Sequence, residues 1–278
     1  MLKLFSFIIG LCAFITCEAA QKANIYHQKI ANSDIYIISL QEKDMNKDIL
    51  LPQNEKEKQL IQEAKVQPNQ HNVVLIKNPQ FIALVDSGFP HTQDILKASL
   101  ASLGVSYKDI NYLIISHAHG DHIGGILNER GENNFPNATL LIDEKEFAYW
   151  QKQDNQRTKD SLNLFTKKAF FNHKKAILSN TLEILAVPAY GHTPGHNFIL
   201  MRPSDKKAQQ DMAQSLVFWA DMLHIYDIQS QNPQISAVYD VNPTLAAQVR
   251  AKFLKQFKSE KIPVVGAHTP FTKPVVLE

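Results

Sequence analysis

Residues 112–125 read YLIISHAHGDHIGG, and this stretch carries the strongest signal in the 278-residue chain. The apolar residues 112–115 predict a buried strand, and three histidines and one aspartate follow it within residues 117–122. Imidazole and carboxylate groups are ligands that suit zinc, and also iron or manganese. The pattern therefore predicts a metal site at the end of a strand, with a solvated histidine-rich loop as the alternative interpretation.

Four further motifs place a histidine or an aspartate directly after an apolar stretch. Each has an ordinary structural interpretation by itself, because a histidine at a strand end is usually satisfied locally and Asp-Ser-Gly is common in turns. Together with residues 117–122 they indicate one site that is assembled from several strand ends. The motifs are VDSG at 85–88, GHTPGH at 191–196, FWAD at 218–221 and GAH at 266–268.

This order of motifs resembles that of the metallo-β-lactamase superfamily, and the resemblance extends over roughly residues 25–278. It implies an α/β fold in four layers, an αββα sandwich of two mixed sheets with the metals at the sheet edge. It also implies a zinc-dependent metallohydrolase with two Zn²⁺ ions, for which Mn or Fe is an alternative. In such an enzyme a hydroxide shared by the two metals attacks the substrate.

The resemblance also assigns roles to individual residues. Asp121 is implied to be a metal ligand and the catalytic group that accepts a proton and passes it on. Asp86 is implied to orient the metal loop from outside the ligand set, and His196 to be structural. The implied ligands are His117, His119 and His192 for one metal, Asp121, His122 and His268 for the other, and Asp221 as the bridge between them.

Outside these motifs, residues 20–278 read as one domain in which helices, strands and hairpins are mixed. The mixture favours a layered sandwich over a simple doubly wound sheet, and no Walker loop, GxGxxG or GxSxG motif is present. Thr92 is predicted to cap a helix. The predicted strands are 25–30, 35–40, 73–77, 81–85, 112–115, 139–142, 182–187, 197–201, 215–219 and 263–266, and the predicted helices are 55–64, 92–103, 144–150, 157–171 and 243–258.

Residues 1–19 have the layout of a cleavable signal peptide, with one early lysine, an apolar run and a small-residue end. Cys12 and Cys17 both lie in this segment, so the mature chain would contain no disulfide and no thiol nucleophile. A periplasmic or secreted protein is therefore predicted. An acylated Cys17 and an uncleaved anchor are the two alternatives.

The last third of the chain resembles the methyl parathion hydrolase branch of the superfamily, to which acyl-homoserine lactonases are close. This implies cleavage of an ester, lactone or phosphotriester. The alternatives are a β-lactamase-type amide hydrolase, a mono-iron oxygenase resembling persulfide dioxygenases, and a metal-storing protein without catalysis. His224 stands where the lactonases usually carry Tyr, so it is either a pocket residue or a packing residue.

The expected partner is a small-molecule substrate with an apolar portion. Phe89, Trp150 and His224 are the candidate substrate-binding residues, although aromatic side chains at helical spacing in 143–171 are also typical of a core. A net charge of +2 argues against a nucleic-acid partner. No stable membrane anchor is expected, and a homodimer is kept open.

Overall fold

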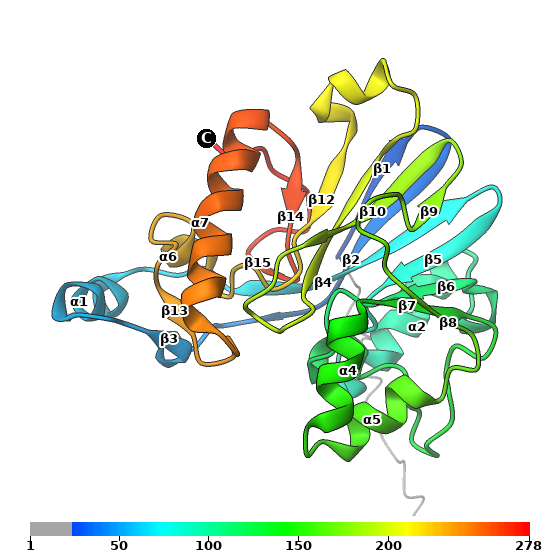
Figure 1. Ribbon diagram of the computed structural model, residues 1–278, viewed down its shortest axis with the longest axis horizontal. Helices are drawn as coiled ribbons and strands as arrows, with labels where there is room; N and C mark the ends of the chain where they lie inside the picture. Colours follow the sequence, from blue (N-terminus) through cyan, green and yellow to red (C-terminus); the bar gives the residue numbers. More distant parts are fainter. Residues whose placement is uncertain (1–23) are drawn as a thin grey trace, which may run out of the picture.

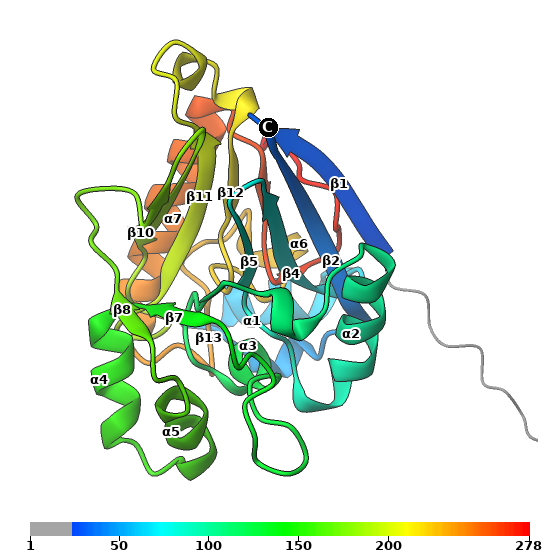
Figure 2. The ribbon, with the colours of Figure 1, turned by 90° about the vertical axis from the view of Figure 1, so that its right-hand side faces the viewer.

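A computed structural model describes residues 24–278, and these residues form two β-sheets packed face to face with helices on both outer faces (Figures 1 and 2). The predicted αββα sandwich is confirmed. The predicted signal peptide, residues 1–19, lies outside the described residues. Within residues 24–278 no helix combines the length and the apolar character needed to cross a bilayer.

The first sheet is antiparallel from β1 to β5 and parallel from β5 to β8, so it is mixed as predicted. Its strands, in spatial order, are β1 (Asn24–Ile30), β2 (Ser33–Lys43), β4 (Asn69–Asn78), β5 (Phe81–Val85), β6 (Tyr112–Ile114), β7 (Thr139–Ile142) and β8 (Lys168–Phe170), and β15 (His268–Thr269) pairs with β4.

The second sheet is antiparallel except for the parallel pair of β12 and β14. Its strands, in spatial order, are β14 (Val264–Val265), β12 (Leu216–Phe218), β11 (Asn197–Pro203), β10 (Leu182–Pro188) and β9 (Leu178–Ser179). A separate two-stranded ribbon consists of β3 (Leu50–Leu51) and β13 (Ser236–Ala237).

The first sheet is apolar on both faces, so one face packs against helices and the other against the second sheet. On β4, Val73 and Leu75 join the core beneath the helices, whereas Val74 and Ile76 join the core between the two sheets. Successive side chains of a strand point to opposite faces, so a continuous apolar run such as 73–76 is buried on both sides.

The helices cover the two outer faces of the sandwich. Leu96 of α2, Trp150 of α4 and Leu162 of α5 pack against the first sheet, and Phe253 and Phe257 of α7 pack against the second. The α-helices are α1 (Glu55–Glu63), α2 (Gln93–Ser102), α3 (Gly120–Ile123), α4 (Glu144–Lys152), α5 (Gln156–Asn163), α6 (Tyr226–Gln229) and α7 (Pro243–Glu260), and short 3₁₀ turns occur at 47–49, 90–92, 107–109, 208–210 and 212–214.

Two local predictions were wrong. The helix expected over 157–171 ends at Asn163, and residues 168–170 form β8 instead, because they pair in parallel with β7 and tertiary pairing overrides local periodicity. Thr92 precedes α2 but does not cap it, since its hydroxyl donates to the carbonyl oxygen of Phe89 in the preceding turn.

Candidate metal centre

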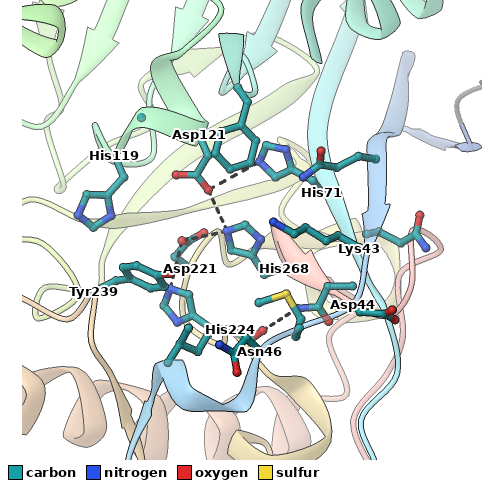
Figure 3. A pocket seen from close by; sticks show the side chains of 17 residues that line it. Lys43, Asp44, Asn46, His71, His119, Asp121, Asp221, His224, Tyr239 and His268 are labelled. Atoms are coloured by element: carbon teal, nitrogen blue, oxygen red, sulfur yellow. Dashed lines mark hydrogen bonds and ion pairs between the residues drawn. The ribbon is translucent and has the colours of Figure 1, made fainter. Parts of the chain in front are cut away.

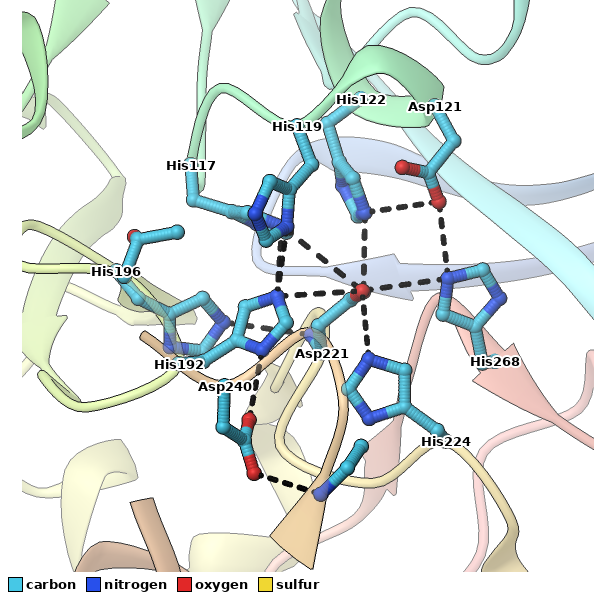
Figure 4. A network of polar contacts seen from close by, with 12 residues as sticks. His117, His119, Asp121, His122, His192, His196, Asp221, His224, Asp240 and His268 are labelled. Atoms are coloured by element: carbon cyan, nitrogen blue, oxygen red, sulfur yellow. Dashed lines mark hydrogen bonds and ion pairs between the residues drawn. The ribbon is translucent and has the colours of Figure 1, made fainter. Parts of the chain in front are cut away.

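Three histidines from two strand ends converge on one point (Figure 4). His117 and His119 follow β6, and His192 follows β10. His119 Nδ1 lies 2.9 Å from His192 Nε2 and 3.1 Å from His117 Nε2, and these two Nε2 atoms are 3.2 Å apart. Ligand atoms on one tetrahedral zinc at about 2.0–2.1 Å are about 3.3 Å apart, so the three nitrogens fit one face of such a site.

A second cluster lies beside the first and consists of Asp121, His122, Asp221 and His268. His268 Nε2 is 3.0 Å from Asp121 Oδ2, and His122 Nε2 is 3.0 Å from Asp221 Oδ1. Asp221 Oδ2 is also 3.6 Å from His192 Nε2 and 3.3 Å from His268 Nε2. The Asp221 carboxylate therefore stands between the two clusters, at the position that the resemblance to the superfamily implies for a bridge.

The protonation states of the three converging histidines and of Asp221 fit bound cations. Burial lowers the pKa of His119 to about 4, so its imidazole is in the neutral form that binds metals. Burial alone would raise the pKa of Asp221, but the surrounding imidazoles hold it well below its usual range. Although burial lowers the pKa of His268, Asp221 and Asp121 raise it to about 10, so a bound cation must displace that proton. His122 Nε2 and Asp221 Oδ1 are 3.0 Å apart but do not meet at hydrogen-bond angles, so within residues 24–278 both are buried without a hydrogen-bond partner, as expected of metal-ligand atoms.

Asp86 lies directly behind the ligand loop, at the end of β5. Its carboxylate accepts hydrogen bonds from the Ser116 backbone N–H and hydroxyl, at 2.9 and 2.7 Å, and from His122 Nδ1 at 2.7 Å. The bond at Nδ1 leaves Nε2 of His122 free for a ligand role. Asp86 has a φ of 60°, in the left-handed region that Asp tolerates better than most residues.

Asp240 supports His192 in the same way, although no motif in the sequence points to it. Its Oδ1 lies 2.9 Å from His192 Nδ1, and its Oδ2 lies 3.3 Å from Nη2 of the buried Arg250. Burial opposes ionisation, but the hydrogen bond from His192 and the Arg250 charge together hold the pKa of Asp240 below its usual range. The pair fixes which nitrogen of His192 faces the cluster.

Glu146 of α4 ties the two histidine motifs together, and it was also missed. Its Oε1 accepts from the Ala118 N–H at 2.8 Å and the Trp150 indole N–H at 2.7 Å. Its Oε2 accepts from the Thr193 hydroxyl at 2.6 Å and the Gly195 N–H at 2.9 Å. Burial raises the pKa of Glu146, and these four donors oppose the rise.

A pocket of about 430 Å³ opens onto the second cluster (Figure 3). Of the three candidate substrate-binding residues, His224 and Phe89 line it. Trp150 does not: it is 9% exposed, belongs to the core beneath α4, and its indole N–H is held by Glu146.

His196 is buried beneath the cluster, where its Nε2 accepts from the Asp221 N–H, in the structural position expected of it.

Residues 66–205, half of the chain, match the family described as Metallo-beta-lactamase superfamily. The chain belongs to this superfamily. It is 26% identical over 130 residues to the uncharacterized protein YobT of Bacillus subtilis, covering 45% of this chain and 54% of YobT. It is 29% identical over 135 residues to the N-acyl homoserine lactonase AttM of Rhizobium radiobacter, and the match covers 44% of this chain and 48% of AttM. The matches thus span about half the length of these relatives.

Two solved structures have the same fold over most of the chain. AidC, described as a dizinc quorum-quenching lactonase in complex with its product, superposes with a TM-score of 0.75 at 23% identity, covering 91% of this chain and 92% of AidC. The hydrolase AbOPH superposes with a TM-score of 0.74 at 21% identity, and the match covers 91% of this chain and 93% of AbOPH. At these identities the likeness shows the fold of the superfamily.

Replacing Glu146 by Gln should destabilise the protein strongly. The amide group of Gln presents N–H to two of the four buried donors, and each donor left without an acceptor costs about 1–3 kcal/mol. We expect the free energy of unfolding in urea to fall by at least about 2 kcal/mol. Glu144→Gln, an exposed neighbour on the same helix, should unfold like the wild type; equal stability of both variants would contradict the role of Glu146.

Replacing Asp86 by Ala should weaken metal binding without changing any proposed ligand. His122 then loses the acceptor that orients its ring, and such outer contacts usually account for a 10- to 100-fold difference in metal affinity. Competition with a chromophoric zinc chelator measures the change. Asp94→Ala, an exposed aspartate at the start of α2, should retain wild-type affinity, whereas a wild-type affinity of Asp86→Ala would refute the orienting role.

Proposed function

We propose that the protein is a periplasmic or secreted hydrolase that binds two zinc ions and cleaves an ester, lactone or phosphotriester bond. The observation that carries the proposal is the pair of ligand clusters joined by Asp221 at the floor of an open pocket. Structural metal sites are usually closed, whereas catalytic sites keep a position open for substrate. A storage role is therefore disfavoured, and so is a one-iron oxygenase, which needs only one ligand cluster.

Zinc ions bound at the two clusters would polarise the carbonyl or phosphoryl oxygen and lower the pKa of water. The side chains of the protein then hold and orient the reacting groups and transfer protons between them. Asp121 is partly exposed to the pocket, and its Oδ2 faces both His268 and His122. In this proposal Asp121 accepts a proton from the attacking water and passes it toward the leaving group.

The pocket wall supports a substrate with an apolar portion. Met45, Ile49, Phe89 and Tyr239 contribute apolar side chains to its lining. His224 lies at its base, with Nε2 3.4 Å from Asp221 Oδ2, and is 2% exposed. AttM and AidC are both described as lactonases, which supports an acyl substrate with a lactone or ester group.

The proposed location depends on residues 1–19, whose sequence has the order of segments found in signal peptides. Cleavage after Ala19 would release a chain without cysteine, which is compatible with an oxidising compartment. Mass spectrometry of the protein isolated from its native cells tests the cleavage and, in the same experiment, lipidation of Cys17.

The purified protein should contain two metal ions per chain and should hydrolyse members of a panel of lactones, aryl esters and phosphotriesters. His119→Ala removes one of three converging nitrogens, so hydrolysis should be lost and the melting temperature should fall while the fold is retained. His91→Ala, which changes an exposed histidine outside both clusters, should behave like the wild type. Full activity of His119→Ala after chelator treatment would refute the mechanism.

Asp221→Ala should reduce the metal content below two per chain. The carboxylate approaches ligands proposed for both metals, at 3.0 Å from His122 and 3.6 Å from His192, so its loss weakens both positions. Elemental analysis after dialysis measures the stoichiometry, and circular dichroism checks that the chain is folded. Two firmly held ions in this variant would exclude a bridging role.

A further inference from the structure

His71, on β4, is a buried histidine that the proposed reaction does not use. Its ring stacks on that of His268, with centroids 5.4 Å apart and planes 10° apart, and lies 4.9 Å from the Phe89 ring. It is 2% exposed, and neither ring nitrogen has a hydrogen-bond partner within residues 24–278. Its Nε2 is 3.9 Å from Asp121 Oδ2, beyond hydrogen-bond distance.

Buried polar groups of native proteins are almost always satisfied, so an unpartnered pair of nitrogens on a pocket wall needs an explanation. His71 lines the pocket. A ligand that enters the pocket would supply the missing partner. The imidazole offers that ligand a hydrogen-bond donor beside the second cluster.

Lys43 lies on the same wall of the pocket. It is the last residue of β2 and is paired with Asn69 of β4, two residues before His71, so both side chains stand on the same face of the sheet as diagonal neighbours. In Figure 3 the Lys43 chain extends from β2 into the pocket, with its amine directed toward the side where His71 and His268 lie. No carboxylate within residues 24–278 lies within 4.0 Å of this amine.

Two side-chain amides next to His71 on β4 are already engaged. The side-chain amide of Asn69 donates to the carbonyl oxygen of His224 at 2.6 Å, and that of Gln70 donates to Glu42 at 2.5 Å. Lys43 and His71 therefore remain as neighbouring donors for a ligand on this wall. Gln41, Asn46 and His224 also line the pocket; within residues 24–278, Gln41 and Asn46 use only their side-chain oxygens in hydrogen bonds, and the His224 ring nitrogens have no hydrogen-bond partner. Asp44, the next residue along, also lines the pocket, and its negative charge partly offsets that of Lys43.

We propose that Lys43 and His71 bind a carboxylate group of the substrate, so that the enzyme prefers esters or lactones that carry a carboxylate away from the bond that is cleaved. The inference rests on the proposed hydrolase function. One ammonium group and one imidazole N–H match the two oxygens of a carboxylate. A doubly charged phosphate would need more positive charge than Lys43 supplies beside Asp44.

The test compares two esters of the same length, 4-nitrophenyl butyrate and mono-4-nitrophenyl succinate, in which a carboxylate replaces the terminal methyl group. The measured quantity is the ratio of kcat/KM for the succinate to that for the butyrate. Lys43→Met should lower this ratio about tenfold or more, mainly through KM for the succinate, because a charge-assisted hydrogen bond is lost. Lys43→Arg should retain the preference, and Asp44→Asn should increase it.

His71→Phe keeps the ring stacked on His268 and removes the N–H, so it should lower the same ratio. Lys56→Met, a change of an exposed lysine on α1, should leave both esters and their ratio unchanged. Metal content is measured for every variant, so that a loss of metal is distinguished from a loss of substrate binding. A wild-type ratio in both Lys43→Met and His71→Phe would overturn the inference.

A failure of the proposed hydrolase function can be distinguished from a failure of the carboxylate site. If the metal-loaded wild type cleaves neither ester, the hydrolase proposal fails for esters, and the two compounds then serve as ligands in calorimetric titrations. A weaker succinate affinity of Lys43→Met, with the wild type preferring the succinate, supports the carboxylate site. Equal affinity of the wild type for the two compounds overturns it.

Discussion

The ionised, buried carboxylate of Asp221 is the constraint on which the rest of the structure depends. An isolated carboxylate is very costly to bury, so it must be surrounded by groups that stabilise its charge. Imidazoles from both clusters surround it, at 3.6 Å for His192 of the first cluster and at 3.0 and 3.3 Å for His122 and His268 of the second. Because these residues come from distant parts of the chain, the sandwich must bring β6, β12 and the segment after β14 to one edge.

The candidate ligands are held in place by further buried carboxylates, which accept hydrogen bonds from them or from their loops. Asp86 orients His122, Asp240 orients His192, and Glu146 binds backbone N–H groups beside His117 and within the 191–196 motif. Each carboxylate accepts hydrogen bonds from the loop that it supports, so the loops are fixed before any ligand binds. Gly195 allows this close approach, since a Cβ there would lie 2.3 Å from the Glu146 backbone nitrogen.

Much of the fold was predictable because its signals are local. The apolar runs at 73–76 and 112–114 identified central strands, and the periodicity of 243–258 identified the helix that covers the second sheet. The segment 157–171 was misjudged because its last residues are held as a strand by β7, a partner that local periodicity cannot reveal. Trp150 was assigned to the pocket because the sequence does not show which face of α4 is buried, and only packing decides this.

The candidate ligands could be named from the sequence, because histidines and aspartates clustered after apolar strands are rare and because the order of their motifs resembles that of the metallo-β-lactamase superfamily. Which other residues act with them depends on the three-dimensional packing. Glu146 lies in a helix whose polar residues look like surface residues, and His71 and Lys43 lie in strands without any motif. Their roles come from strand register and from contacts between residues far apart in the chain, and the free energy of such contacts is set by burial that no local pattern encodes.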